Sequence, residues 1–178
     1  MVQTARPDAD TSVGAWAASD GGSDRFAMIN GASAGSDYIH VTDDSSGSSF
    51  PITLSLSSVT DPSSTDAHSV VVRAVVAGVS GEVNLNVNLK DGGSSIKNET
   101  FTLQDSFTNH TMNLSTAQLN SISESGYGNL TLVLTSTDDS YSGSFQTKIS
   151  QAYFTCPDAS SSVPIAAIAM NTYRQMGN

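Results

Sequence analysis

The feature that most limits what this chain can fold into is a strict alternation of apolar and polar side chains in short segments. Apolar residues alternate with asparagines over residues 83–89, and residues 52–56 and 129–134 follow the same period of two. Successive side chains of a β-strand point to opposite faces of its sheet, whereas a helix needs a longer repeat. These segments therefore predict strands with one buried face and one face in water.

Further strand patterns extend this interpretation to most of the chain. A β-branched, nearly continuous apolar run at residues 70–76 predicts a central strand that is buried on both faces. The Asp-Gly-Gly sequence at residues 91–93 is typical of a hairpin turn, so residues 96–103 should return beside residues 83–89. Seven or eight short strands, the last over residues 145–154, predict an all-β fold, an antiparallel jelly-roll-like β-sandwich.

Two segments have helical rather than strand character. Ser115 followed three residues later by Gln118 matches a capping box, which predicts one short helix within residues 114–122. An apolar segment that begins at Pro164 predicts a C-terminal helical tail. The chain of 178 residues is therefore expected to contain an N-terminal arm at residues 1–15, a β-sandwich domain at residues 16–157, and a linker with the helical tail at residues 158–178.

The composition excludes several classes of partner. Only 13% of the residues are charged, and seven Lys and Arg oppose 17 Asp and Glu, for a net charge of −10. Nucleic acids and anionic membranes both attract basic surfaces, so neither is expected as a partner. No apolar run approaches the length of a membrane span, and residues 1–7 lack the apolar core of a secretory signal. We therefore expect a chain that is made in a cytoplasm.

No motif for catalysis or cofactor binding stands out. The histidines His40, His68 and His110 are not accompanied by a Gly-x-Ser-x-Gly sequence, so we assign them structural or surface roles. Glu82 and Glu99 fall beside the ends of the predicted hairpin and should face solvent, which argues against a glycosidase pair. The chain is therefore not expected to be an enzyme or to hold a cofactor.

Metal binding is a minor alternative. The single cysteine, Cys156, cannot form an internal disulfide or a zinc cluster, and we expect it to pack as a small apolar residue. Aspartates in loops supply the oxygen ligands that calcium prefers. A structural calcium ion would be sought near Asp8 and Asp10 or near Asp43 and Asp44, although no metal site is the main expectation.

The order of several short segments resembles a set of β-sandwich proteins encoded by tailed bacteriophages. The matching segments cover most of residues 5–157 and comprise Arg6-Pro7-Asp8-Ala9-Asp10, Trp16, Ser36-Asp37-Tyr38-Ile39, Asp61-Pro62, the run from His68 to Ala74, the predicted helix, and the run from Ile149 to Phe154. The resemblance implies a virion structural component, either a head decoration (cement) protein or a module of a tail or fibre. It brings no catalytic residues with it.

The absence of a heptad pattern and the single-domain length favour capsid decoration among these roles. The expected partner is then the major capsid protein, the expected location is the outer capsid surface of the virion, and the protein would act as a homo-oligomer, with a trimer as one possibility. The N-terminal arm and the C-terminal tail are the segments expected to bind the capsid. Their candidate partner-binding residues are Arg6, Trp16, Ile165, Ile168, Met170 and Met176.

The main alternative is an adhesion module on the tail or fibres that binds host carbohydrate. Such modules stack sugars on exposed aromatic rings, for which Tyr127 and Tyr141 are the best candidates because they flank Gly-rich turns. Trp16 could stack a sugar or, equally well, plug the open end of the sandwich. A tail-tube or neck accessory domain is a third interpretation.

Overall fold

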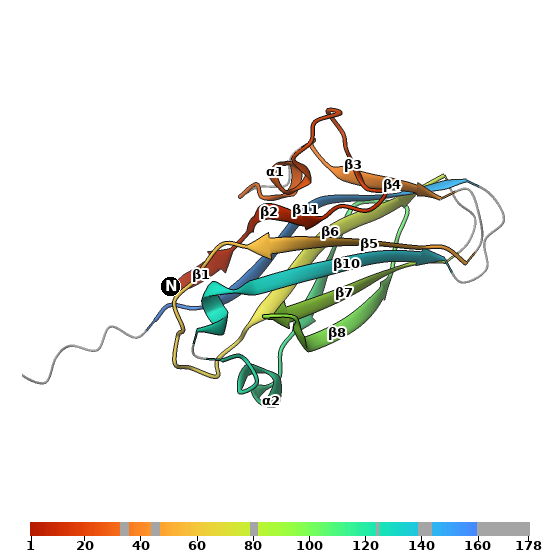
Figure 1. Ribbon diagram of the computed structural model, residues 1–178. Coiled ribbons are helices and arrows are strands. Elements are labelled where there is room, and N and C mark those ends of the chain that lie inside the picture. The colour runs from red at the N-terminus through yellow and green to blue at the C-terminus, as the bar shows by residue number, and fades with distance from the viewer. Residues whose placement is uncertain (33–35, 44–46, 79–81, 124, 139–143, 160–178) are drawn as a thin grey trace, which may run out of the picture.

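Two antiparallel sheets pack face to face in the computed structural model and form a β-sandwich (Figure 1). The structure describes residues 1–32, 36–43, 47–78, 82–123, 125–138 and 144–159. The predicted fold class is confirmed, although the described residues include short helices at two places, α1 (Arg25–Ile29) and α2 (Thr116–Leu119). The predicted C-terminal helical tail lies outside the described residues.

One sheet has six strands, in the order β3-β4-β11-β6-β9, and β1 also pairs with β11. The bounds of its strands are β1 (Val2–Ala5), β3 (Ala17–Ala18), β4 (Ile39–Asp43), β6 (Ser69–Ala77), β9 (Thr108–Asn113) and β11 (Phe145–Pro157). The other sheet has five strands, in the order β2-β5-β10-β7-β8. Its strands are β2 (Pro7–Ser12), β5 (Ser49–Leu56), β7 (Val83–Asp91), β8 (Ser94–Thr102) and β10 (Leu130–Asp138).

The alternating segments behave as predicted. In β7 the four apolar side chains of Val83, Leu85, Val87 and Leu89 are fully buried between the sheets. The asparagines of β7 point outward and form hydrogen bonds with hydroxyls of β8, such as the 3.0 Å bond between Asn86 Nδ2 and Thr100 Oγ1. Such cross-strand pairs stabilise a hairpin and fix its register. The predicted hairpin of β7 and β8 is confirmed.

β6 is buried on both of its faces, as the sequence predicts. Val72 and Ala74 point into the core, with 1% and 0% exposure. Val71 and Val75 lie on the outer face and are nevertheless buried, at 9% and 6% exposure. A layer of longer side chains must therefore cover the outer face of the six-stranded sheet.

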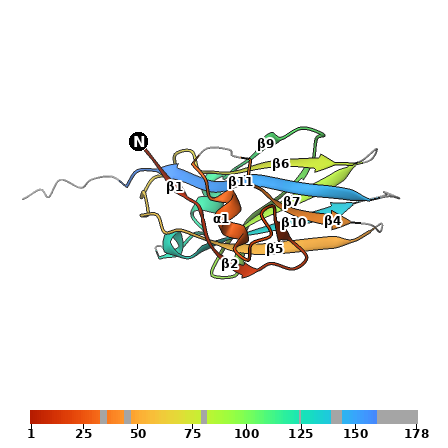
Figure 2. The same cartoon turned by 90° about the horizontal axis from the view of Figure 1, so that it is seen from above.

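The long strand β11 has different partners along one of its edges. β4 pairs with residues 145–149 of β11, and β1 pairs with Phe154 to Pro157. Between these two pairings the register with β6 shifts, because Ser150 is an extra residue that forms a β-bulge. The helix α1 and Gly31 lie beside this gap, and Gln151 Nε2 donates a 2.8 Å hydrogen bond to the carbonyl oxygen of Gly31. Figure 2 shows α1 lying between β2 and β11 along this side of the sandwich.

The first residues are part of the sandwich, which corrects the expectation of a separate arm at residues 1–15. β1 and β2 each join a sheet, because the two halves of this segment complete unpaired edges of β11 and β5. Ala5 is fully buried between the sheets. An extended segment with unpaired backbone groups gains hydrogen bonds by adding to a sheet edge.

Asp10 of β2 fixes the start of α1. Its Oδ2 accepts a 2.7 Å hydrogen bond from the backbone N–H of Arg25, and its Oδ1 accepts a 2.8 Å bond from that of Phe26. A helix of five residues cannot form on its own and depends on such contacts. The cap places Ile29, which is fully buried, in the gap beside β11. No helix in the described ranges combines the length and the apolar character needed to cross a bilayer.

We expect Asp10→Ala to lower the free energy of unfolding by about 1–2 kcal/mol, because it leaves two N–H groups of α1 without an acceptor. Asp8→Ala is the matched control, since Asp8 lies on the same strand, is exposed, and loses the same charge. Urea denaturation of both variants measures the difference. Equal stability of the two variants would show that Asp10 does not anchor α1.

Candidate functional site

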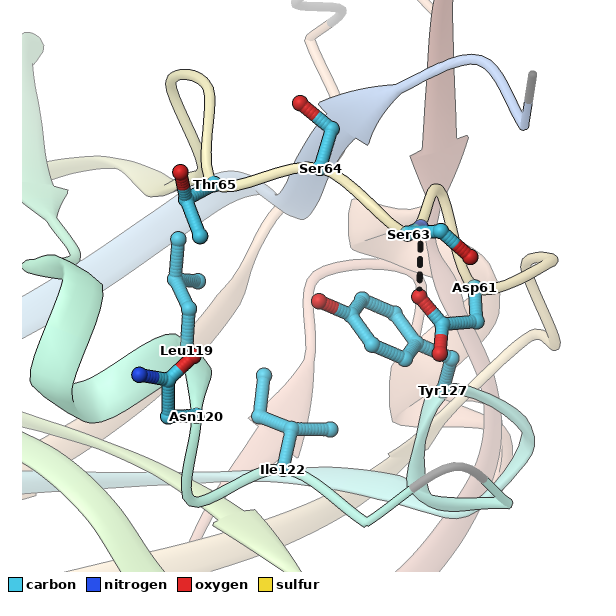
Figure 3. A pocket seen from close by; sticks show the side chains of 8 residues that line it. All are labelled: Asp61, Ser63, Ser64, Thr65, Leu119, Asn120, Ile122 and Tyr127. Carbon is cyan, nitrogen blue, oxygen red and sulfur yellow. Dashed lines mark hydrogen bonds between the residues drawn. The ribbon is translucent and has the colours of Figure 1, made fainter.

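A pocket of about 460 Å³ opens at one end of the sandwich, between the β5–β6 connection and the segment that runs from α2 to Tyr127 (Figure 3). Its floor consists of three buried side chains, Leu119, Ile122 and Tyr127. Its rim is polar and is formed by Asp61, Ser63, Ser64, Thr65 and Asn120. Pockets of this size that combine an apolar floor with a few polar groups are typical of small-molecule binding.

Tyr127 is held in one orientation by groups behind the pocket. Its hydroxyl hydrogen-bonds to His68 Nε2 at 3.0 Å, and His68 Nδ1 in turn lies 2.6 Å from the carbonyl oxygen of Asp66. If Nδ1 carries the proton and donates to that carbonyl, Nε2 is the acceptor and the Tyr127 hydroxyl donates. The rings of His68, Tyr127 and Phe154 also pack together, with centroids 5.9–6.4 Å apart. The aromatic floor is therefore rigid.

The polar rim is shaped by a tight turn. Asp61 Oδ1 accepts a 2.7 Å hydrogen bond from the backbone N–H of Ser63. Ser63 has φ of +51°, the only positive φ of a non-glycine residue in the described part of the chain. This conformation is uncommon for serine and is found more often at functional sites than elsewhere. The N–H of Val59 donates to the carbonyl of Tyr127 at 3.2 Å, which ties the rim to the floor.

The segment before Tyr127 depends on a close approach to the β7–β8 hairpin. Asp91 Oδ2 accepts hydrogen bonds from both the N–H and the hydroxyl of Ser123, at 3.0 and 2.8 Å. A Cβ at Gly126 would lie 2.4 Å from the same carboxylate oxygen. Glycine is therefore required at this position, which explains one of the two glycines that flank Tyr127.

The electrostatics keep the floor uncharged. Burial, followed by the charges of Asp61 and Cys156, raises the pKa of Tyr127 to about 12. Burial, followed by Asp158 and Asp61, raises the pKa of the Cys156 thiol to about 11. The pocket therefore presents one carboxylate, several hydroxyls and an amide around a neutral aromatic ring. Such groups exchange hydrogen bonds with an uncharged polar ligand.

The candidate partner-binding residues are not brought together at this pocket. Trp16 is 1% exposed and donates its Nε1–H to the carbonyl of Phe50, so it packs in the core rather than contacting a partner. Arg6 is half-buried on the outer face of the six-stranded sheet, with its guanidinium 5.2 Å from the centre of the Tyr153 ring. The other four lie outside the described residues: Ile165, Ile168, Met170 and Met176. Their contacts with a partner stay predictions.

The other candidates are dispersed. Tyr141 and Asp44 lie outside the described residues. Asp10 caps α1, and in the described ranges no three His, Cys, Asp or Glu side chains are grouped so that they could hold a metal ion. His40 and His110 lie apart from the pocket. Burial, followed for His40 by the charge of Lys148, lowers their pKa values.

Sequence reasoning singled out Tyr127 but expected an exposed ring, whereas the structure leaves its side chain only 6% exposed at the floor of the pocket. It missed the rest of the site. The Gly-Tyr-Gly sequence signalled an aromatic residue beside a turn. The capping box also located α2, where Gln118 Oε1 accepts a 2.8 Å hydrogen bond from the N–H of Ser115. Nothing in the sequence indicated that residues 61–65 would face Tyr127, because this proximity depends on how β5, β6 and β10 are ordered in the two sheets.

Comparisons with known proteins identify no family for this chain. No family model matches the sequence. No curated protein matches it either.

Several solved structures share the sandwich architecture. TmCBM61 in complex with β-1,4-galactotriose is 12% identical, with a TM-score of 0.42 over 70% of this chain and 72% of that chain. A structure described as "CBM4 structure and function" is 9% identical, with a TM-score of 0.44 over 79% of this chain and 93% of the other. The C-terminal CBM6 of LamC from Zobellia galactanivorans is 13% identical, with a TM-score of 0.40 over 84% and 99%.

The raised pKa of Tyr127 gives a test of how the floor is built. The unfolded tyrosine ionises near pH 10 and the folded one near pH 12, so the unfolded state loses its proton first. The free energy of unfolding should therefore be independent of this ionisation below pH 10 and should fall between pH 10 and about 12.

We expect Tyr127→Phe to lower the free energy of unfolding by about 1–3 kcal/mol at pH 7, because His68 Nε2 loses its hydrogen-bond partner. Above pH 10, the free energy of unfolding of this variant should decline less than that of the intact protein. Urea denaturation across this pH range measures both effects. Cys156 is present in both proteins, so the ionisation of its thiol near pH 11 is part of both pH profiles. Parallel pH profiles for the two proteins would contradict the assignment.

Proposed function

We propose that this chain is a non-catalytic carbohydrate-binding domain and that the pocket at the end of the sandwich binds one sugar unit of a neutral glycan. The observation that carries the proposal is the division of the pocket into an apolar floor and a polar rim. Leu119, Ile122 and Tyr127 form the floor, and the rim supplies a carboxylate, three hydroxyls and an amide.

A sugar ring has the complementary division. Its C–H groups form an apolar face that packs on an aromatic or aliphatic surface, and its hydroxyls lie around the ring edge. A carboxylate such as that of Asp61 accepts hydrogen bonds from sugar hydroxyls, and the Asn120 amide both donates and accepts. Because the turn at Ser63 and the ring of Tyr127 are held in place before binding, little ordering cost is expected.

This function agrees with the adhesion module that the sequence offered as an alternative. Capsid decoration is a different proposal, with the major capsid protein as its partner and the virion surface as its location. No contact in the described structure favours it over glycan binding, and it stays a prediction from the resemblance alone.

The test uses a double variant on the rim, Thr65→Val with Asn120→Ala. Both side chains are exposed, so the fold should be retained. We expect the intact protein to bind neutral oligosaccharides on a glycan array, and the double variant to bind the strongest hit about tenfold or more weakly in calorimetric titration, since two hydrogen bonds are lost.

The matched control is Thr131→Val with Asn98→Ala on the five-stranded sheet. It makes the same chemical changes away from the pocket, and affinity should change little. An equal loss of glycan affinity in both double variants would show that the pocket is not the binding site. Failure of the intact protein to bind any neutral glycan would overturn the proposed function.

A further inference from the structure

The outer face of the six-stranded sheet carries a group of basic and aromatic side chains that the pocket does not involve. We call it the cation–aromatic face and define it by the cations Arg6, Arg73 and Lys148 with the rings that they cover. Arg6 lies 5.2 Å from the centre of the Tyr153 ring. Arg73 lies 4.5 Å from that of Phe107, and Lys148 lies 4.8 Å from that of Tyr38.

The sheet register places these groups on one surface. Lys148 is the partner of Val75 across β11 and β6, Gln151 is the partner of Arg73, and Tyr153 is the partner of Val71. The three β6 positions, Val75, Arg73 and Val71, are therefore two residues apart, which corresponds to a spacing of about 7 Å along the strand. The three cations follow one another along the strand direction, on the same outer face as the buried Val71 and Val75.

Within the described residues, none of these three cations forms an ion pair with a carboxylate. In the described part of the chain, the ion pairs join the N-terminus to Asp158 and Lys97 to Glu99, and neither involves the face. This is unexpected in a chain with 17 acidic residues and only seven basic ones. A ring under a cation orders the side chain but leaves its positive charge in place. The face therefore holds pre-ordered positive charges that are available to an anion.

Uncharged polar groups accompany the cations. Gln146 hydrogen-bonds to Thr42 at 3.2 Å beside Lys148, and Arg73 Nη1 donates to Ser150 Oγ at 2.8 Å. His40 lies next to Tyr38, with ring centroids 5.8 Å apart, and its Nδ1 is buried without a hydrogen-bond partner in the described structure. The rings of Tyr38 and Tyr153 remain half-exposed.

We propose that the cation–aromatic face is a second binding site, separate from the pocket, for an acidic polysaccharide whose sugar units carry carboxylates. Spaced cations match the spaced carboxylates of such a polymer, and the half-exposed rings and amide groups match its sugar rings and hydroxyls. A nucleic acid fits less well. Its phosphates are densely spaced, so the net charge of −10 opposes it more strongly than it opposes a polysaccharide with one carboxylate per sugar unit, and three cations would neutralise few of the phosphates.

The test compares polygalacturonate with its methyl-esterified form, which keeps the sugar chain but removes the carboxylate charge. We expect the intact protein to bind polygalacturonate, with an affinity that falls as salt screens the charges, and to bind the ester much more weakly. The double variant Arg73→Gln with Lys148→Gln should bind polygalacturonate at least about tenfold more weakly.

The matched control is Lys90→Gln with Lys97→Gln on the five-stranded sheet, which changes the net charge by the same amount and should change the affinity by no more than about twofold. Arg73→Gln removes the cation that packs on Phe107, so the single variant Lys148→Gln is measured as well as the double variant. Urea denaturation checks that the single variant and the double variant are both folded. The pocket variant Thr65→Val with Asn120→Ala should bind polygalacturonate as the intact protein does, which separates this site from the proposed function.

Several outcomes would overturn the second site. One is an equal loss of affinity for polygalacturonate in Arg73→Gln with Lys148→Gln and in the control Lys90→Gln with Lys97→Gln. Another is binding of the esterified polymer as tight as that of polygalacturonate. A third is tighter binding of single-stranded DNA or of polyglutamate than of polygalacturonate. Self-association that disappears in Arg73→Gln with Lys148→Gln would instead assign the face to a second copy of the chain. In that case too, the polysaccharide site would be rejected.

Discussion

The edge of β11 is the constraint on which the rest of the molecule depends. This strand has 13 residues, and no single neighbour satisfies its backbone along the β4 side. β4 and β1 pair with its two ends, and the Ser150 bulge, the helix α1 and the Gly31 carbonyl occupy the gap between them. Buried backbone groups must find hydrogen-bond partners, so this edge determines where the N-terminal 32 residues run. Asp10 completes the arrangement by capping α1.

The same strand supports both candidate binding regions. Neighbouring residues of a strand point to opposite faces, so Phe154 points inward and packs against His68 and Tyr127 under the pocket. Tyr153 points outward and lies under Arg6 on the cation–aromatic face. The bulge turns Ser150 outward as well, where it receives the hydrogen bond from Arg73. A disturbance of the register of β11 should therefore affect both regions, whereas changes in the surrounding loops should affect only one.

The two regions differ in chemistry because the charges are unevenly distributed. The pocket is uncharged apart from Asp61, and burial keeps Tyr127 protonated to high pH. The outer surface of β7 and β8 consists largely of asparagine and hydroxyl side chains that satisfy one another across the strands. Three of the seven basic residues, by contrast, lie on one sheet face without a carboxylate partner in the described structure. An acidic protein thus keeps one surface suited to anions.

The sequence by itself determined the fold class, the β7–β8 hairpin, the doubly buried strand β6 and the capped helix α2, because periodicity, turn residues and caps are local signals. It did not indicate that residues 2–12 form strands, since pairing at a sheet edge needs no apolar pattern of its own. Tertiary structure alone decided that Trp16 packs in the core, that Asp61 faces Tyr127, and that Arg6, Arg73 and Lys148 share a surface. These residues are distant in the chain, and only the order and register of the strands bring them together.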